Sequence, residues 1–208
     1  MKVTPRKIWT LWVITLSWAL CTGAAHAEIP ASGCFDFSAP PAPLQNAERS
    51  RTEDAGRLDS GSVWAKQEKL LDRPIGDILS DLEKHQLTKS SKVDEMTIQS
   101  SPDPRSIARQ TIEFKVHPFL FVVVEWKEDW VFRVLKGNSA DPLQIWVGYQ
   151  KTEGTSHIDH LCGSYILTRK SPNQTDVSLI EEVKASRRSL EDTQKGVAST
   201  LDRLGRGK

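Results

Sequence analysis

The feature that most constrains the fold is a succession of short alternating runs in the second half of the chain. Apolar and polar side chains alternate around Ile112, Trp130, Leu143, Tyr165 and Val177, and the turn-forming stretches "NSADP" and "SPNQT" separate runs. A period of two predicts strands, and short polar connections predict antiparallel neighbours. The continuously apolar "FLFVVVEW" (119–126) predicts a strand buried on both faces. We therefore expect an antiparallel meander.

The segments on either side of this meander predict helices. Before it, residues 62–71 predict a first strand, and apolar residues then recur at helical spacing behind Pro74, at Ile75, Ile78, Leu79 and Leu82. After it, residues 182–204 show a narrow apolar stripe with a period of seven, at Val183, Leu190, Val197 and Leu204, with Leu201 beside it. Such a stripe is typical of an amphipathic helix. The predicted fold class is α+β.

The N-terminus is typical of an export signal. A basic start (Lys2, Arg6 and Lys7) precedes an apolar core at 8–25, and "AHA" offers a cleavage site before Glu28. We predict a cleaved signal peptide at 1–27 and a periplasmic or extracellular location. A retained anchor is the alternative, because the core is near the lower limit for a membrane span. Cleavage leaves a net charge of +1 − 3 = −2, so nucleic acid is not expected as a partner.

Residues 28–60 contain many turn formers and little apolar periodicity, which predicts an extended or disordered leader. Cys34 lies in this leader, and Cys162 lies in the meander. In an oxidising compartment such a pair usually forms a disulfide. The bridge would close a loop of 162 − 34 = 128 residues, which the chain-entropy model credits with about 4–5 kcal/mol. Two separate thiols are the alternative.

The order of elements resembles the START-like (SRPBCC) helix-grip superfamily, which includes polyketide cyclases and lipid-transfer domains. The resemblance is carried by "RPIGDIL" after the first strand, by the last strands from "VGYQKTEG" to "IEEVKASRR", and by the final helix. It implies a curved antiparallel sheet wrapped around a long C-terminal helix, in one domain at 61–204 with a tail at 205–208. We expect a monomer.

In that superfamily the space between sheet and helix holds an apolar ligand. The resemblance implies a cavity wall drawn from Trp130, Phe132, Ile145, Val147, Tyr149, Tyr165, Val177, Leu179, Leu190, Val197 and Leu201. The expected partner is a hydrophobic small molecule or lipid. The alternative is that these residues simply fill a core, because a packed core and a lined cavity both need apolar walls.

Potential catalytic or metal-binding side chains are concentrated in the stretch "EGTSHIDHLCG" (153–163). His157 and His160 would share one face of a helix but not of a strand, and the stretch contains neither HExxH nor CxxC. We interpret it as an exposed polar loop between two strands, with no metal, in which Cys162 is the consequential residue. A metal site would need a further ligand such as His117.

Glu181 is the strongest candidate for acid–base chemistry. It shares parity with Val177, Leu179 and Val183, so a regular strand would direct it inward. There it would act as a general base with a raised pKa, or pair with Arg133 or Arg187. Tyr149 and Tyr165 are weaker catalytic candidates, since each is more often a core residue. At a strand end, Glu181 would instead turn to solvent.

Other catalytic signatures are absent from the sequence. Ser156 and His157 are adjacent without a nucleophile elbow, and no P-loop or dinucleotide fingerprint occurs, so no cofactor is expected. We therefore predict an exported domain that binds or carries a hydrophobic ligand. The alternatives are a cyclase or dehydratase using a cavity carboxylate, and an envelope protein-interaction module.

Overall fold

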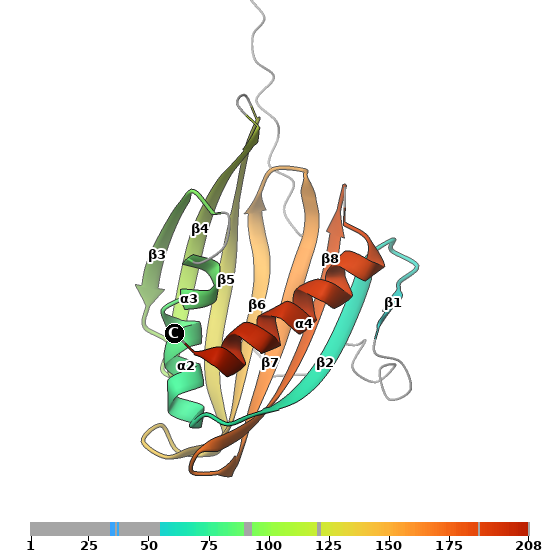
Figure 1. Cartoon of the computed structure of the whole chain (residues 1–208). Helices are drawn as coiled ribbons and strands as arrows, with labels where there is room; N and C mark the ends of the chain where they lie inside the picture. Colours follow the sequence, from blue (N-terminus) through green and yellow to red (C-terminus); the bar gives the residue numbers. More distant parts are fainter. Residues whose placement is uncertain are drawn as a thin grey trace, which may run out of the picture.

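The computed structural model describes residues 34–35, 37, 55–89, 93–119, 122–186 and 188–207. The predicted signal peptide lies outside these residues, as does most of the leader. Within the described ranges, eight strands form one antiparallel sheet, and α4 lies across one side of it (Figure 1). The first strands are β1 (Ala55–Arg57), β2 (Val63–Leu71), β3 (Glu95–Ser101) and β4 (Ala108–Phe119). The meander continues with β5 (Val122–Gly137), β6 (Pro142–Gly154), β7 (Ile158–Ser171) and β8 (Gln174–Ala185).

The strand order is β1-β2-β8-β7-β6-β5-β4-β3, so the first and third strands form the two edges and the curved sheet stays open. Alternation sends one set of side chains to the concave face and the other to the convex face. On β5, Trp130 and Phe132 join the large concave core, whereas Val131 packs on the convex face. The predicted antiparallel helix-grip sheet is confirmed.

The long helix α4 (Leu190–Arg206) covers the concave face. Its start is fixed by a capping box in which Ser189 and Asp192 exchange side-chain and backbone hydrogen bonds. The prediction of helix from residue 182 is wrong, because β8 continues to Ala185 and pairs with both β2 and β7. Val183 therefore belongs to the strand. Among the described residues, no helix is both long enough and apolar enough to cross a membrane.

Two short helices, α2 (Ile75–Glu83) and α3 (Gln86–Lys89), lie near the C-terminal end of α4 (Figure 1). The sequence predicted one helix here, but His85 has a φ of 51° and interrupts it. His85 is buried, and its ring lies edge-on against Trp130 with centroids 4.8 Å apart. Arg73 joins α2 to α4 by donating to Asp81 and to the carbonyl oxygen of Leu204.

Two sequence interpretations of the meander are wrong. Val122 and Val123 are 36% and 42% exposed where β5 begins, so the run "FLFVVVEW" is not a strand buried on both faces. The stretch 153–163 is mostly strand, since only residues 155–157 separate β6 from β7. His160 is consequently buried on β7 rather than exposed in a loop.

Part of the predicted leader is integrated into the domain. β1 extends the sheet by pairing with β2, so the ordered sheet begins before residue 61. Farther upstream, Phe35 and Phe37 pack on the convex face against Trp146, with ring centroids 5.4 and 6.2 Å away. Gln150 on β6 holds the backbone of Phe35 with two hydrogen bonds.

Candidate ligand-binding site

The concave face beneath α4 has a filled part and an open part. In the filled part, seven of the residues expected to line a cavity pack against one another at no more than 1% exposure: Phe132, Ile145, Val147, Val177, Leu179, Val197 and Leu201. Leu190 is half-buried at the first turn of α4 and belongs to neither the described core cluster nor the cavity lining. For most of these residues, the structure places a packed core where the family implied a ligand wall.

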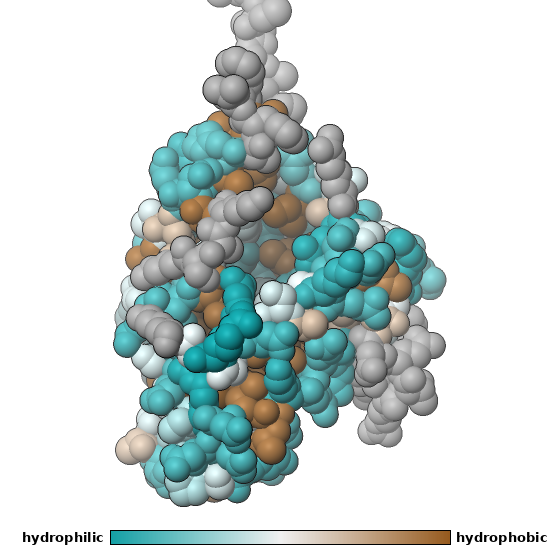
Figure 2. All heavy atoms as spheres, in the orientation of Figure 1, coloured by the Kyte–Doolittle hydropathy of each residue, from teal (hydrophilic) through white to brown (hydrophobic). Residues whose placement is uncertain are grey.

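The open part is a cavity of about 470 Å³ between the sheet, α3 and α4. Its lining includes Trp130, Tyr149 and Tyr165 from the expected set, and Glu181. The volume falls in the range typical of small-molecule sites, about 300–1,000 Å³. Figure 2 shows a hollow in this face with hydrophobic residues at its floor, above the polar outer surface of α4.

Aromatic rings form the rigid part of the cavity wall. Trp130 and Tyr149 stack with centroids 4.5 Å apart and planes 14° from parallel. Gly163 faces Tyr149 directly across the β6–β7 pair, and a Cβ at this position would collide with the tyrosine ring. A glycine here thus gives Tyr149 the room to lie over the sheet and stack on Trp130.

Glu128 is a cavity residue that the sequence reasoning missed. It is 5% exposed and accepts hydrogen bonds from the indole nitrogens of Trp126 (2.7 Å) and Trp130 (2.9 Å). Burial raises the pKa of Glu128 to about 7, although both hydrogen bonds favour the carboxylate. The period of two along β5 would have identified Glu128, because the side chains of residues 126, 128, 130 and 132 project to the same face.

Glu181 lies in the same cavity. Tyr149 Oη donates to Glu181 Oε2 at 3.1 Å, and Arg188 Nη2 donates to Oε1 at 3.2 Å. Burial raises the pKa of Glu181, and the charge of Arg188 opposes that rise. Burial and the neighbouring Glu181 also raise the pKa values of Tyr149 and Tyr165, so both phenols stay protonated.

Among the described residues, the cation that pairs with Glu181 is Arg188, which the sequence did not suggest. Arg133 points to the convex face, where it donates to the carbonyl oxygen of Phe37, and Arg187 lies outside the described residues. Arg188 follows the end of β8 and precedes the cap of α4, so the connection between strand and helix supplies the charge. Arg203, on α4, adds a second guanidinium to the lining.

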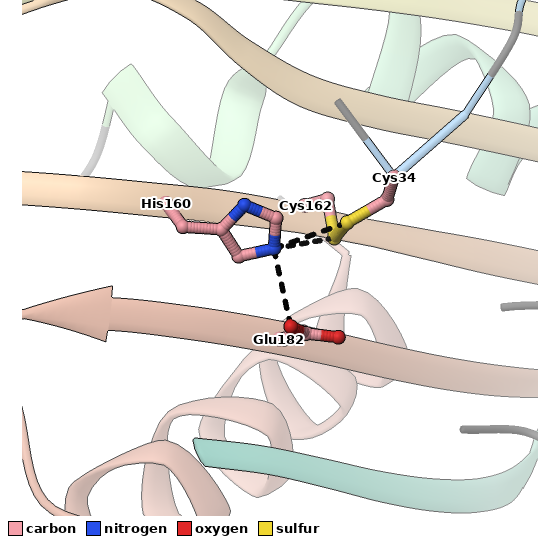
Figure 3. Close-up of side chains that lie close together, drawn as sticks. All are labelled: Cys34, His160, Cys162 and Glu182. Atoms are coloured by element: carbon pink, nitrogen blue, oxygen red, sulfur yellow. Dashed lines mark hydrogen bonds and ion pairs between the residues drawn. A yellow bond between two sulfur atoms is a disulfide. The ribbon is translucent and has the colours of Figure 1, made fainter. Parts of the chain in front are cut away.

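The convex face carries a separate cluster, shown in Figure 3. The predicted disulfide between Cys34 and Cys162 is confirmed, with Cα atoms 6.2 Å apart. His160 Nε2 lies 3.1 Å from Cys34 Sγ and 3.2 Å from Glu182 Oε1. Among the described residues, these four side chains have potential metal-ligand atoms within 4.8 Å of one another.

Comparisons with known proteins identify the fold. No family model matches the chain, and neither does any curated protein. The human StarD13 (DLC2) lipid transfer and protein localization domain matches with a TM-score of 0.52 at 8% identity, over 80% of this chain and 98% of that one. The chain therefore has the START-like helix-grip fold, and the predicted resemblance is confirmed at the level of the fold.

Two enzymes with lower TM-scores also match. The Zhui aromatase/cyclase from Streptomyces sp. R1128 matches with a TM-score of 0.41 at 9% identity, over 70% of this chain and 88% of that one. Norcoclaurine synthase from Thalictrum flavum, in complex with dopamine and hydroxybenzaldehyde, matches with a TM-score of 0.43 at 12% identity, over 83% and 95%.

Proposed function

We propose that the protein is an exported START-like domain that binds a hydrophobic small molecule or lipid in the cavity beneath α4. The single observation that carries the proposal is the cavity of about 470 Å³, walled by stacked aromatic rings in a domain whose remaining concave face is filled. The space is partly open to solvent, and concave spaces of this volume with mainly aromatic and apolar walls are typical small-molecule sites.

The polar groups of the cavity restrict the ligand further. Tyr165, Glu128 and Glu181 line the same space as the apolar side chains, and two arginines, Arg188 and Arg203, lie at the α4 side. Polar groups placed within an apolar wall fix a ligand's orientation. We expect a mostly apolar molecule with one hydrogen-bonding or anionic end, held with that end toward the arginines.

Export is supported by the disulfide, because such bonds persist mainly in oxidising compartments. It joins the upstream segment to β7 across 128 residues. Mass determination of the N-terminus after expression in a secreting host tests this part. Mature protein starting at Glu28 is expected; protein retaining residues 1–27 would contradict cleavage.

The ligand proposal is tested by native mass spectrometry and solvent extraction after purification without detergent. Ala185→Trp places a large ring in the cavity lining, and Leu143→Trp adds the same ring at a side chain that is 48% exposed elsewhere. A bound mass is expected with the parent protein and Leu143→Trp, and it should be lost with Ala185→Trp. Ligand retained equally by all three proteins would refute the cavity as the site.

A second candidate function is a cyclase- or dehydratase-type lyase. It is favoured by the hydrogen bond between Tyr149 and Glu181 inside the cavity, since a partly buried carboxylate with a raised pKa is suited to act as a general base. In that role the Glu181 carboxylate would take a proton from carbon, the neighbouring C–O bond would break as the C=C bond forms, and the protonated Glu181 would return the proton so that the hydroxyl leaves as water. The Tyr149 hydroxyl would orient the substrate oxygen.

The variant Glu181→Gln distinguishes a ligand carrier from a lyase. A carrier should keep its ligand with this variant, because the amide preserves size and polarity. An enzyme should still bind the ligand recovered from the parent protein but no longer convert it. Conversion at the parent rate by Glu181→Gln would exclude the lyase mechanism.

A further inference from the structure

The convex-face cluster brings together side chains from three separate segments. Cys162 on β7 pairs directly with Glu182 on β8, and direct partners in a sheet project to the same face. His160 precedes Cys162 by two residues and joins them there. The upstream segment then carries Cys34 onto the strands (Figure 3). Two thiols, an imidazole and a carboxylate form a donor set that zinc accepts.

The three edges of a tetrahedral site that meet at His160 Nε2 are close to the lengths that zinc requires. With Zn–S near 2.3 Å and Zn–N or Zn–O near 2.0–2.1 Å, tetrahedral ligands stand about 3.5 Å apart for a sulfur–nitrogen pair and about 3.3 Å for a nitrogen–oxygen pair. His160 Nε2 lies 3.1 and 3.5 Å from the sulfur atoms of Cys34 and Cys162, and 3.2 Å from Glu182 Oε1. The edge between the two bonded sulfurs must lengthen substantially.

The site would stay assembled after the disulfide is opened. The backbone of Phe35, next to Cys34, donates one hydrogen bond to the Gln150 side chain and accepts another from it, and Phe35 and Phe37 pack against Trp146. The β7–β8 ladder fixes the other three ligands. The side chains of His160 and Glu182 are each 11% exposed, and Cys162 is fully buried. A preassembled, largely buried donor set lowers the ordering cost of binding a metal ion.

We propose that this cluster is a redox-gated zinc site, in which the Cys34–Cys162 disulfide and a bound Zn²⁺ are alternative ways to tether the upstream segment to the sheet. A dithiol reductant transfers two electrons and two protons to the disulfide, giving two thiols and leaving the reductant as a disulfide. Zn²⁺ then binds both sulfurs as thiolates, releasing two protons to water, with His160 Nε2 and Glu182 completing the tetrahedron.

When His160 is neutral and Glu182 is ionised, the disulfide form and the zinc form of the cluster carry the same charge. A disulfide is neutral, and Zn²⁺ with two thiolates is also neutral, so Glu182 contributes the same single negative charge beside either centre. The exchange thus buries no additional net charge on the convex face. If the two thiolates did not neutralise Zn²⁺, moving the ion's charge from water into this largely buried site would cost a large desolvation free energy.

The test measures the amount of zinc bound per chain in purified protein. One sample is reduced with a phosphine and one is kept oxidised, and both pass through gel filtration before the measurement. One zinc per chain is expected for reduced protein and less than about a tenth of that for oxidised protein. Cobalt(II) added to the reduced protein should show a thiolate charge-transfer band and intense tetrahedral absorption. Reduced protein without stoichiometric zinc, or oxidised protein that binds it equally, would overturn the proposal.

Variants that retain both cysteines separate an assembled site from simple thiol binding. His160→Gln and Glu182→Gln should each weaken zinc binding at least about tenfold, while thermal unfolding of their oxidised forms checks that they are folded. The controls are His157→Gln, at an exposed neighbouring position, and Glu181→Gln, on the opposite face. Parent-level affinity in His160→Gln would show that the cluster is not the site.

Discussion

Two neighbouring glutamates on β8 show how differently the two faces of the sheet are used. Glu181 points into the concave cavity, where it binds Tyr149 and Arg188. Glu182 points to the convex face, beside His160 and the disulfide. The concave face keeps a space open under its helix, and the convex face is closed by a segment from more than a hundred residues upstream.

The two faces of the curved sheet are covered in different ways. On the concave side, a continuous apolar stripe on α4 buries the core, with Val197 and Leu201 at 1% exposure. On the convex side a short segment is held by a covalent bond and a few aromatic contacts. The concave side should therefore depend on apolar packing, and the convex side on the oxidation state of two sulfurs.

Removing the Cys34–Cys162 disulfide on the convex face should lower the stability of the protein most. Cys34→Ser removes the disulfide without introducing a hydroxyl at the fully buried Cys162. In the presence of a metal chelator, it should lower the free energy of unfolding by about 4 kcal/mol. Denaturant unfolding measures this loss. Parent protein should fall to the same level when reduced, and Cys34→Ser as stable as the oxidised parent would show that the bridge contributes nothing.

Two adjacent residues of α4 sharpen the contrast between filled and open parts of the concave face. Leu201 is 1% exposed in the core, so Leu201→Ala should cost about 3 kcal/mol. Thr200 lines the cavity, so Thr200→Ala should cost about 1 kcal/mol or less. Denaturant unfolding of ligand-free protein checks both values. Equal losses would mean that the cavity is closed by packing in solution.

Glu128 makes the cavity side sensitive to pH. Because its folded-state pKa is raised from 4.5 to about 7, the folded protein retains a proton that the unfolded chain has lost. Stability should therefore fall as pH rises through this window, by up to about 3 kcal/mol. Glu181, whose pKa is also raised, acts in the same direction. Glu128→Gln should flatten the profile measured by denaturant unfolding; an unchanged profile would contradict a buried titrating carboxyl.

The two histidines near the β6–β7 turn should give the smallest effects. In oxidised protein, His157→Gln should change stability by less than about 0.5 kcal/mol, because His157 is exposed. His160→Gln should cost about 1–2 kcal/mol, because it disturbs a buried contact with Glu182. Thermal unfolding distinguishes them, and equal tolerance at both positions would restore the interpretation of this stretch as a polar loop.

Most of the fold was predictable from periodicity. Alternation at Trp130, Phe132 and their neighbours correctly assigned residues to the faces of β5, and the stripe at Val197, Leu201 and Leu204 correctly identified the helix that covers the sheet. The boundary between β8 and α4 was misplaced, because Val183 fits both the strand pattern and the heptad. Ser189 and Asp192, as a capping pair, carried the correct signal.

The site was less predictable, because sequence parity says which face a side chain occupies and not whether the space above it is filled. Phe132 and Trp130 share a face, yet Phe132 is buried in the core while Trp130 also borders the cavity. The convex cluster depends on where Cys34 is brought, and on β7 continuing through His160, which the glycine and polar residues before it concealed. The position of Cys34 and the extent of β7 both depend on contacts between residues far apart in the sequence.

The most direct test of the central claim is detection of a ligand in the cavity. Protein purified without detergent from a host that secretes it should show an added mass in native mass spectrometry, and organic solvent should extract this mass as a mostly apolar molecule. Ala185→Trp should lack this mass, and Leu143→Trp should keep it. Parent protein that shows no added mass and takes up no fluorescent lipid or apolar probe would contradict the account.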